Sequence, residues 1–121
     1  MSSRKSNLQA VGSLIGQAAA HGIMYGDEDR ERILYLHQAR DKTERFSSIN
    51  DKERDFVIFQ AISKGGRQIR EAERYGKIST DAAHDAQHLL SSAVDSLVAR
   101  LFSDRSRYWQ DVSRDGEEWD R

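Results

Sequence analysis

The 121-residue sequence contains neither cysteine nor proline. Without cysteine, the chain forms no disulfide, offers no thiolate nucleophile or Cys-ligated zinc site, and fits a reducing compartment. We therefore expect a cytoplasmic protein. Without proline, nothing forbids long helices, whereas a turn-rich β protein ordinarily contains several prolines. The sequence therefore favours an all-α fold.

The sequence also lacks an excess of charge of one sign and a long apolar run. It has 19 Lys and Arg residues against 20 Asp and Glu residues, so composition alone does not indicate nucleic-acid binding. No stretch approaches the roughly 18 apolar residues of a membrane span, and we expect no membrane association. Arg4 and Lys5 precede Leu8–Ala20 in the manner of a signal peptide. Polar residues interrupt that segment, however, and we interpret it as the first helix of the domain.

The hydrophobic fraction is 37% and the charged fraction is 32%, which is lean in apolar residues for a globular domain. The length predicts a single helical domain over residues 1–121, with about 6–114 as the ordered core. We expect the polar end, 115–121, to be frayed. Such a core leaves apolar surface for a second copy or a partner to cover.

Apolar residues recur at helical spacing in four main segments and one short one. The predicted architecture is a helical bundle of four main helices plus a short C-terminal helix. We expect the main helices to span about 6–21, 27–46, 50–76 and 79–101, and the short helix to follow Ser103. The fourth helix is the most hydrophobic, so we expect it to be central.

Two local patterns in the third segment are specific. Asn50 and Glu53 have the spacing of a capping box, in which each side chain bonds the other residue's amide. Glycines at 65–66 suggest a break, but the apolar and small residues keep a spacing of four, three, four, three and four across them. That spacing favours one long helix, either straight or kinked at the glycine pair.

Histidines are the first candidates for chemistry. His84 and His88 lie one helical turn apart, where two imidazoles can share one metal ion. The helical wheel places them opposite the apolar face, whereas metal sites in bundles usually face inward and use several helices. We therefore predict no cofactor and no physiological metal site, with zinc or nickel bound weakly at most.

His37 follows Arg30 and Arg32 in a pattern that occurs in one class of helical ribonucleases. Catalysis there needs convergent groups in a polar cleft, and the sequence does not locate them. The alternative is an exposed or half-buried histidine with no catalytic role. The chain also lacks a phosphate-binding glycine loop, a nucleophile elbow and a dinucleotide fingerprint. We predict that the protein is not an enzyme.

The third helix carries a basic ridge on its predicted outer face. Such a ridge suits a phosphate backbone or an acidic protein surface, although Glu71 and Glu73 lie within one turn of it, and a solvated face is the alternative. Trp109 and Trp119 are further candidates for a protein contact, since aromatic residues outside a bundle either pack back on it or anchor a partner. The ridge consists of Lys64, Arg67, Arg70, Arg74 and Lys77.

The first helix carries a small-residue strip of Gly12, Gly16, Ala19 and Ala20. Small residues let two helix backbones approach closely, either inside one bundle or between two chains. A homodimer and a monomer are both compatible with this pattern. We predict a homodimer because the broad apolar face of the fourth helix exceeds what three other helices readily cover.

These observations favour a non-enzymatic protein-interaction module that binds and modulates a larger protein or assembly. An adaptor, inhibitor or assembly factor, such as a phage- or plasmid-type accessory protein, has this character. One alternative is a nucleic-acid-binding regulator that uses the basic ridge. The other is a metal-dependent or ribonuclease-like helical enzyme that uses His37 or the His84/His88 pair.

Overall fold

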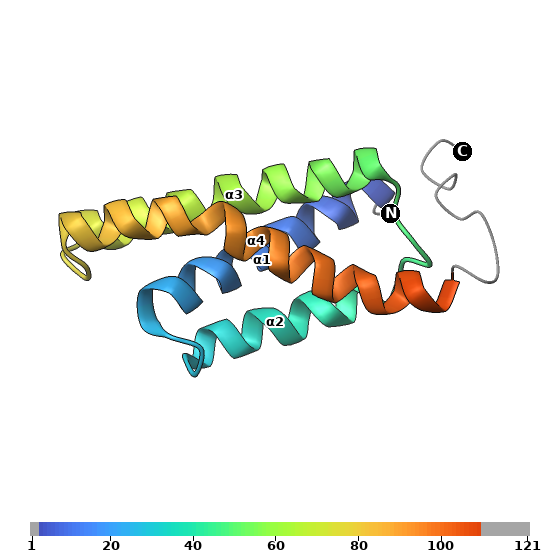
Figure 1. Ribbon diagram of the computed structural model, residues 1–121, viewed down its shortest axis with the longest axis horizontal. Helices are drawn as coiled ribbons and strands as arrows, with labels where there is room; N and C mark the ends of the chain where they lie inside the picture. Colours follow the sequence, from blue (N-terminus) through green and yellow to red (C-terminus); the bar gives the residue numbers. More distant parts are fainter. Residues whose placement is uncertain (1–2, 110–121) are drawn as a thin grey trace.

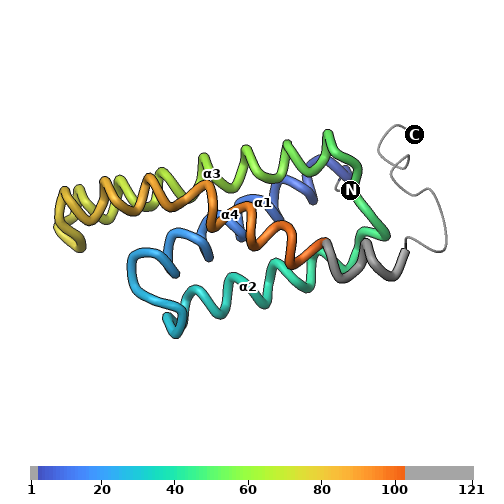
Figure 2. The backbone as a smooth tube through the Cα atoms, viewed as in Figure 1, coloured from blue at the N-terminus to red at the C-terminus, as the bar shows by residue number. Residues whose placement is uncertain are grey.

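The computed structural model describes residues 3–109, and their side chains as far as Phe102. It contains four helices, α1 (Arg4–Tyr25), α2 (Arg30–Thr43), α3 (Asp51–Arg74) and α4 (Thr80–Trp109), and no strand within the described range. Successive helices run in opposite directions, and α3 and α4 extend together beyond the α1–α2 end (Figures 1 and 2). The prediction of an all-α helical bundle is confirmed. Within this range, no helix is long and apolar enough to cross a membrane.

The predicted capping box begins α3. The Asn50 side chain accepts a hydrogen bond from the Glu53 amide at 2.8 Å, and the Glu53 carboxylate accepts one from the Asn50 amide at 3.0 Å. The Ser79 hydroxyl likewise caps α4, because it accepts a hydrogen bond from the Ala82 amide. These caps satisfy amides that have no partner inside the helix.

The first two helices begin at other residues than predicted. Ser3 caps α1 by accepting a hydrogen bond from the Ser6 amide. Asp29, rather than Asp27, caps α2 by accepting one from the Arg32 amide at 3.0 Å. That bond is the main reason why the pKa of the Asp29 carboxyl lies below its usual value. Several capping residues compete in both segments, so spacing alone does not select one.

The glycine pair at 65–66 does not break α3, which is continuous and ends before Gly76 at a φ of 75°. The structure corrects the prediction of a separate short helix after Ser103, because residues 103–109 continue α4 without a break. The rest of the expected ordered core, the polar end 115–121 and Trp119 lie outside the described residues.

The central helix is α1 rather than α4, which corrects the expectation from hydrophobicity. It packs against all three other helices, and its most extensive contact is with α3. Eight of its residues are buried. The fourth helix packs against α3 and α1 and meets α2 only marginally. Small residues in α1 allow this position, since they bring neighbouring backbones close.

A buried carboxylate ties the beginnings of α1 and α3 together. The Glu53 side chain is fully buried, and the Arg4 guanidinium donates to it at 2.6 Å and at 3.3 Å. The same guanidinium donates to the Ser48 carbonyl at 2.8 Å and lies 4.9 Å from the centre of the Phe46 ring. The charge of Glu53 is therefore paired and hydrogen-bonded, as a buried charge needs to be.

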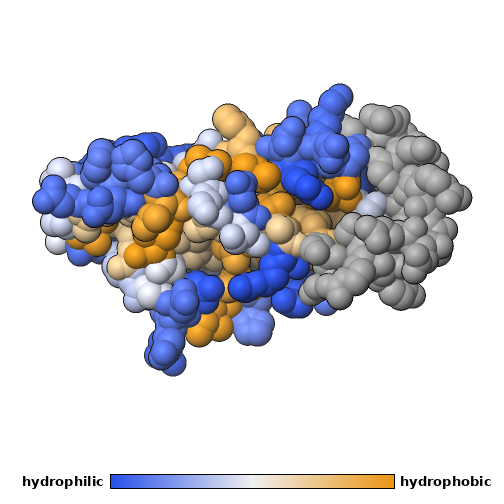
Figure 3. All heavy atoms as spheres, in the orientation of Figure 1, coloured by the Kyte–Doolittle hydropathy of each residue, from blue (hydrophilic) through white to orange (hydrophobic). Residues whose placement is uncertain are grey.

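The first half of α2 is less covered than its apolar spacing predicts. Ala39, Thr43 and Phe46 are buried, as expected for a core-facing stripe. Ile33 continues the same helical spacing but is 42% exposed, and Leu34 beside it is 52% exposed. Hydrophobic atoms reach the surface over the region where α4 passes α2 (Figure 3). The bundle therefore leaves apolar surface open beside α2.

Candidate interaction site between α2 and α4

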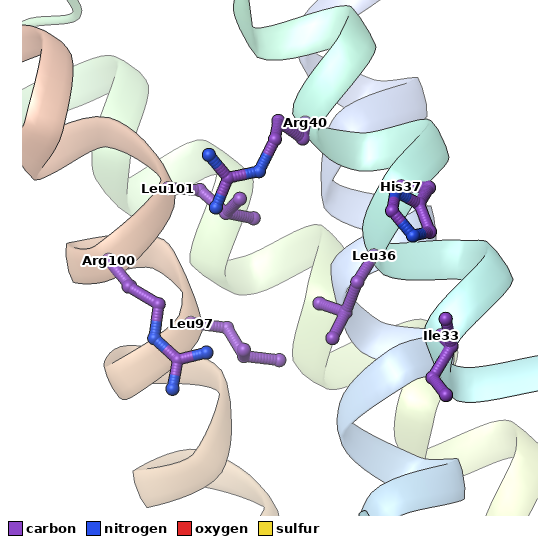
Figure 4. A pocket seen from close by; sticks show the side chains of 7 residues that line it. All are labelled: Ile33, Leu36, His37, Arg40, Leu97, Arg100 and Leu101. Atoms are coloured by element: carbon purple, nitrogen blue, oxygen red, sulfur yellow. The ribbon is translucent and has the colours of Figure 1, made fainter. Parts of the chain in front are cut away.

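A groove of about 210 Å³ lies between α2 and α4. Its apolar wall consists of Leu36 from α2 and of Leu97 and Leu101 from α4, all of which extend toward the space between the two helices (Figure 4). Ile33 continues this wall toward the beginning of α2. The two leucines of α4 are buried, whereas Leu36 is only half-buried. The groove is thus an open extension of the hydrophobic core, and we call it the α2–α4 groove.

Cationic side chains flank the α2–α4 groove from both helices. Arg40 reaches across from α2, and Arg100 projects from α4 into the same region (Figure 4). His37 completes the lining, which contains no acidic residue. Neither arginine forms an ion pair with a residue that the structure describes. The site therefore combines an apolar wall with two available positive charges.

The packing of the other helices explains why the groove is open. The second helix packs mainly against α1, and α4 packs against α3 and α1. Both helices pack on α1, and they contact each other only marginally. Leu36 consequently stays half-buried at the opening, whereas Leu97 on the facing side of the groove is covered (Figure 4).

The predicted basic ridge lies on the outer face of α3 and the turn that follows it. Lys64 is half-buried and the other four residues are exposed. None of the five forms an ion pair with the described residues, so the expected pairing with Glu71 and Glu73 is absent from that part of the chain. The ridge and the α2–α4 groove are separate features, because no ridge residue lines the groove.

The histidine candidates lie on two different helices, His37 on α2 and the pair His84 and His88 on α4. His84 and His88 are exposed on α4, with their Nε2 atoms 3.2 Å apart. Among the described residues, no group of three His, Asp or Glu side chains could hold a metal ion. His37 is exposed at the edge of the α2–α4 groove, whereas Arg32 points elsewhere and donates to the Asp27 carbonyl. The structure therefore does not bring His37 and Arg32 into one cleft.

The small-residue strip packs inside the chain. A Cβ atom on Gly12 would lie 2.8 Å from the Gln60 Cβ atom, and one on Gly16 would overlap the backbone of Ala61. Ala19 and Ala20 are also buried. All four residues of the strip are covered by the protein's own helices and form no open surface. The predicted homodimer would have to use another face.

Of the two tryptophans, Trp109 is the last residue of α4, and its side chain is not described. Trp119 lies outside the described residues.

Sequence reasoning identified the groove residues individually but not the groove. Ile33, Leu36, Leu97 and Leu101 are apolar positions at helical spacing, and His37 was considered as a catalytic residue. Their common location depends on how α2 and α4 sit on α1. The one available signal was the pair of arginines, Arg40 and Arg100, beside apolar positions on two helices.

Comparisons with known proteins yield no relative: no family model, no curated protein and no solved structure matches the chain. No relative therefore supplies a ligand or a reaction for this groove.

Proposed function

We propose that this protein is a non-enzymatic interaction module that binds an acidic amphipathic helix of a larger protein in the α2–α4 groove. The observation that carries the proposal is an open apolar groove between two helices with an arginine on each wall. Apolar surface that is left open in this way commonly marks a protein interface.

The chemistry of the lining favours an acidic helical partner. A helix docks in a groove through apolar residues at helical spacing, which would meet Leu36, Leu97 and Leu101. Acidic residues on the flanks of that helix would meet Arg40 and Arg100, because no acidic side chain of the lining competes for them. Arginine is also enriched among residues that dominate binding energy.

The groove is better suited to binding than to catalysis. Among its lining residues, His37 is the only side chain that commonly transfers protons near neutral pH. General acid–base catalysis of the ribonuclease kind needs a second such group within reach. A partner helix held in the groove would instead be masked from its own target, which is how a small module can modulate a larger protein.

A synthetic helical peptide with a leucine face and glutamate flanks tests the proposal by fluorescence anisotropy. We expect saturable binding, and at least about tenfold weaker binding after Ile33→Asp or Arg40→Glu. Leu34→Asp is the matched control for the first variant, because Leu34 is adjacent and more exposed but does not line the groove. Arg45→Glu is the control for the second.

Several outcomes would contradict the proposal. A peptide with lysine flanks should bind much more weakly, so equal binding would show that the arginines have no role. An effect of Leu34→Asp as large as that of Ile33→Asp would place the contact outside the groove. Two results would identify another occupant: dimerisation abolished by Ile33→Asp, or binding of a synthetic 110–121 peptide in the groove.

The second candidate function is nucleic-acid binding by the basic ridge. The exposure of Arg67, Arg70 and Arg74, and the absence of ion pairs to described residues, support it. Changing all three to Glu should then abolish binding without unfolding the protein, and binding should weaken steeply with salt. No binding by the unmodified protein at low salt would eliminate this candidate.

A further inference from the structure

Tyrosines from three helices gather around a second cavity, of about 220 Å³, at the opposite side of α2. Tyr25 is the last residue of α1, Tyr35 lies in α2, and Tyr75 caps the end of α3. Three of the four tyrosines in the sequence therefore line one cavity, although they are far apart along the chain. We call this cavity the tyrosine site.

His21 holds two of these rings in place. Its ring contacts Tyr25 edge-on at a centroid distance of 5.3 Å and Tyr35 edge-on at 5.4 Å. The Nδ1 atom of His21 lies 3.0 Å from a carboxylate oxygen of Asp29, the residue that caps α2. These three contacts restrict the imidazole, so the two tyrosine rings are positioned before any ligand arrives.

The charges that line the tyrosine site favour a cation. Glu31 and Glu71 line it, and neither carboxylate forms an ion pair or a side-chain hydrogen bond with the described residues. Lys77 is the one positively charged side chain of the lining, and it is exposed. Aromatic faces beside acidic groups are a recurrent arrangement for organic cations.

Gln68, also in the lining, adds an independent observation. Its Oε1 atom is buried and accepts no hydrogen bond within the described part of the chain. Its Nε2 atom donates to Gln17, whose own amide nitrogen donates to the Ser13 carbonyl. This chain of hydrogen bonds orients both amides, so Gln68 is left with an unused acceptor. A buried acceptor without a donor is costly, so the polar groups on this side of the lining are incompletely satisfied.

From this geometry we propose that the tyrosine site binds a guanidinium group. A guanidinium is planar, stacks on aromatic rings and carries five N–H donors, which matches tyrosine rings and two carboxylates in one lining. A quaternary ammonium would use the rings but has no N–H donor for the carboxylates of Glu31 and Glu71. The guanidinium can belong to a free small molecule or to an arginine side chain of a peptide.

The tyrosine site does not depend on the α2–α4 groove. Glu31 and Tyr35 lie one turn apart on α2, whereas Ile33, Leu36 and Arg40 lie on the other side of the same helix. A failure of the groove proposal would consequently leave this inference standing, and the reverse also holds.

Titrations with three small probes, followed by NMR of the backbone amides, test the inference. Methylguanidinium should bind saturably and shift the amides of Tyr25, Glu31 and Tyr75. N-methylurea has nearly the same shape without the charge and should produce no saturable shift. Tetramethylammonium carries the charge without donors and should bind at least about threefold more weakly. No saturable shift with methylguanidinium, or equal binding of methylguanidinium and N-methylurea, would overturn the inference.

Single substitutions test which residues contact the bound methylguanidinium. Glu71→Gln should weaken methylguanidinium binding about threefold to fivefold, and Tyr75→Ala by a similar factor. Tyr75 is 70% exposed, so its replacement leaves the core intact. Glu73→Gln is the matched control, because Glu73 lies on the same helix outside the lining. Equal effects of Glu71→Gln and Glu73→Gln would show a general charge effect and contradict the site.

The source of the group is decided by comparing agmatine with the tripeptide Gly-Arg-Gly. Tighter binding of the tripeptide indicates an arginine side chain, and tighter binding of agmatine indicates a free small molecule. Binding of neither to the unmodified protein would overturn the inference.

Discussion

The close crossing of α1 and α3 gives the sharpest prediction about stability. Gly16 lies where a side chain would overlap the carbonyl group of Ala61 on α3. In Gly16→Ala the added methyl group meets backbone atoms, which cannot rotate away as the end of a side chain can. The two helices would have to move apart, and the packing around Gly65, close to the Gly16 carbonyl, would loosen with them.

The expected magnitude follows from two opposing terms. Replacing glycine by alanine inside a helix stabilises it by about 1 kcal/mol. Forcing an extra methyl group into a packed interface costs about 1–3 kcal/mol, and backbone overlap puts Gly16 at or above the upper end. We therefore expect Gly16→Ala to destabilise the fold by about 2 kcal/mol or more.

Gly66→Ala is the matched control. Gly66 is also inside a helix and buried, but its added Cβ would meet the end of the flexible Gln87 side chain at 3.3 Å. The stability of this variant should lie within about 1 kcal/mol of that of the unmodified protein, because it gains the same helix propensity as Gly16→Ala but its methyl group meets side-chain atoms instead of backbone. The two melting temperatures should differ by about 10 °C in a chain of this size.

Urea and thermal unfolding, followed by circular dichroism, measure both variants, and light scattering after size exclusion gives their oligomeric state. Gly16→Ala should melt earlier with no change of oligomeric state. A Gly16→Ala variant as stable as Gly66→Ala would refute the close crossing. If the variant dissociated a dimer while keeping its monomer stable, the small-residue strip would be an interface between chains.

Two further predictions concern charged groups. Arg4→Met leaves the Glu53 carboxylate buried without its partner and should lower the free energy of unfolding by about 3–5 kcal/mol, a shift of about 2 M in the urea midpoint. The control Lys5→Met changes an exposed neighbour and should shift the midpoint little. Equal shifts in the two variants would contradict the buried pair. Asp29 has a lowered pKa in the folded state, so its contribution to stability is present above the unfolded pKa of about 3.9 and is lost as the pH falls through the lower folded value. Asp29→Asn keeps a good cap, and its urea midpoint should fall less between pH 7 and pH 3 than that of the unmodified protein; an identical fall in both would assign acid sensitivity to other groups.

Much of the helix pattern was predictable because the forces that form helices are local. The capping box at Asn50 and Glu53 involves neighbours along the chain, and so does the phase that carries α3 through its glycine pair. The same reasoning failed where several residues offered the same local interaction, as at Asp27 and Asp29, of which Asp29 caps α2. It also failed after Ser103, where nothing in the local pattern distinguishes a new helix from the continuation of α4.

The residues of the candidate site were predictable in kind but not in arrangement. Leu97 and Leu101 are recognisable as apolar helix positions, and the three tyrosines are visible in the sequence. Their assembly depends on which faces of the helices meet. Arg4 likewise gives no local sign that it pairs with Glu53, 49 positions further along the chain.

The sequence by itself determined that the chain is helical, where its caps can form and that α3 is continuous, because spacing and capping act within a few residues. Only the tertiary structure decided that α1 is central, that its glycines are covered by α3 and that α2 and α4 leave a groove. Those outcomes depend on how closely whole helices approach one another. Glycine and alanine admit close backbones on one side of α1, and the resulting positions of α2 and α4 leave Ile33 and Leu36 of α2 only partly covered.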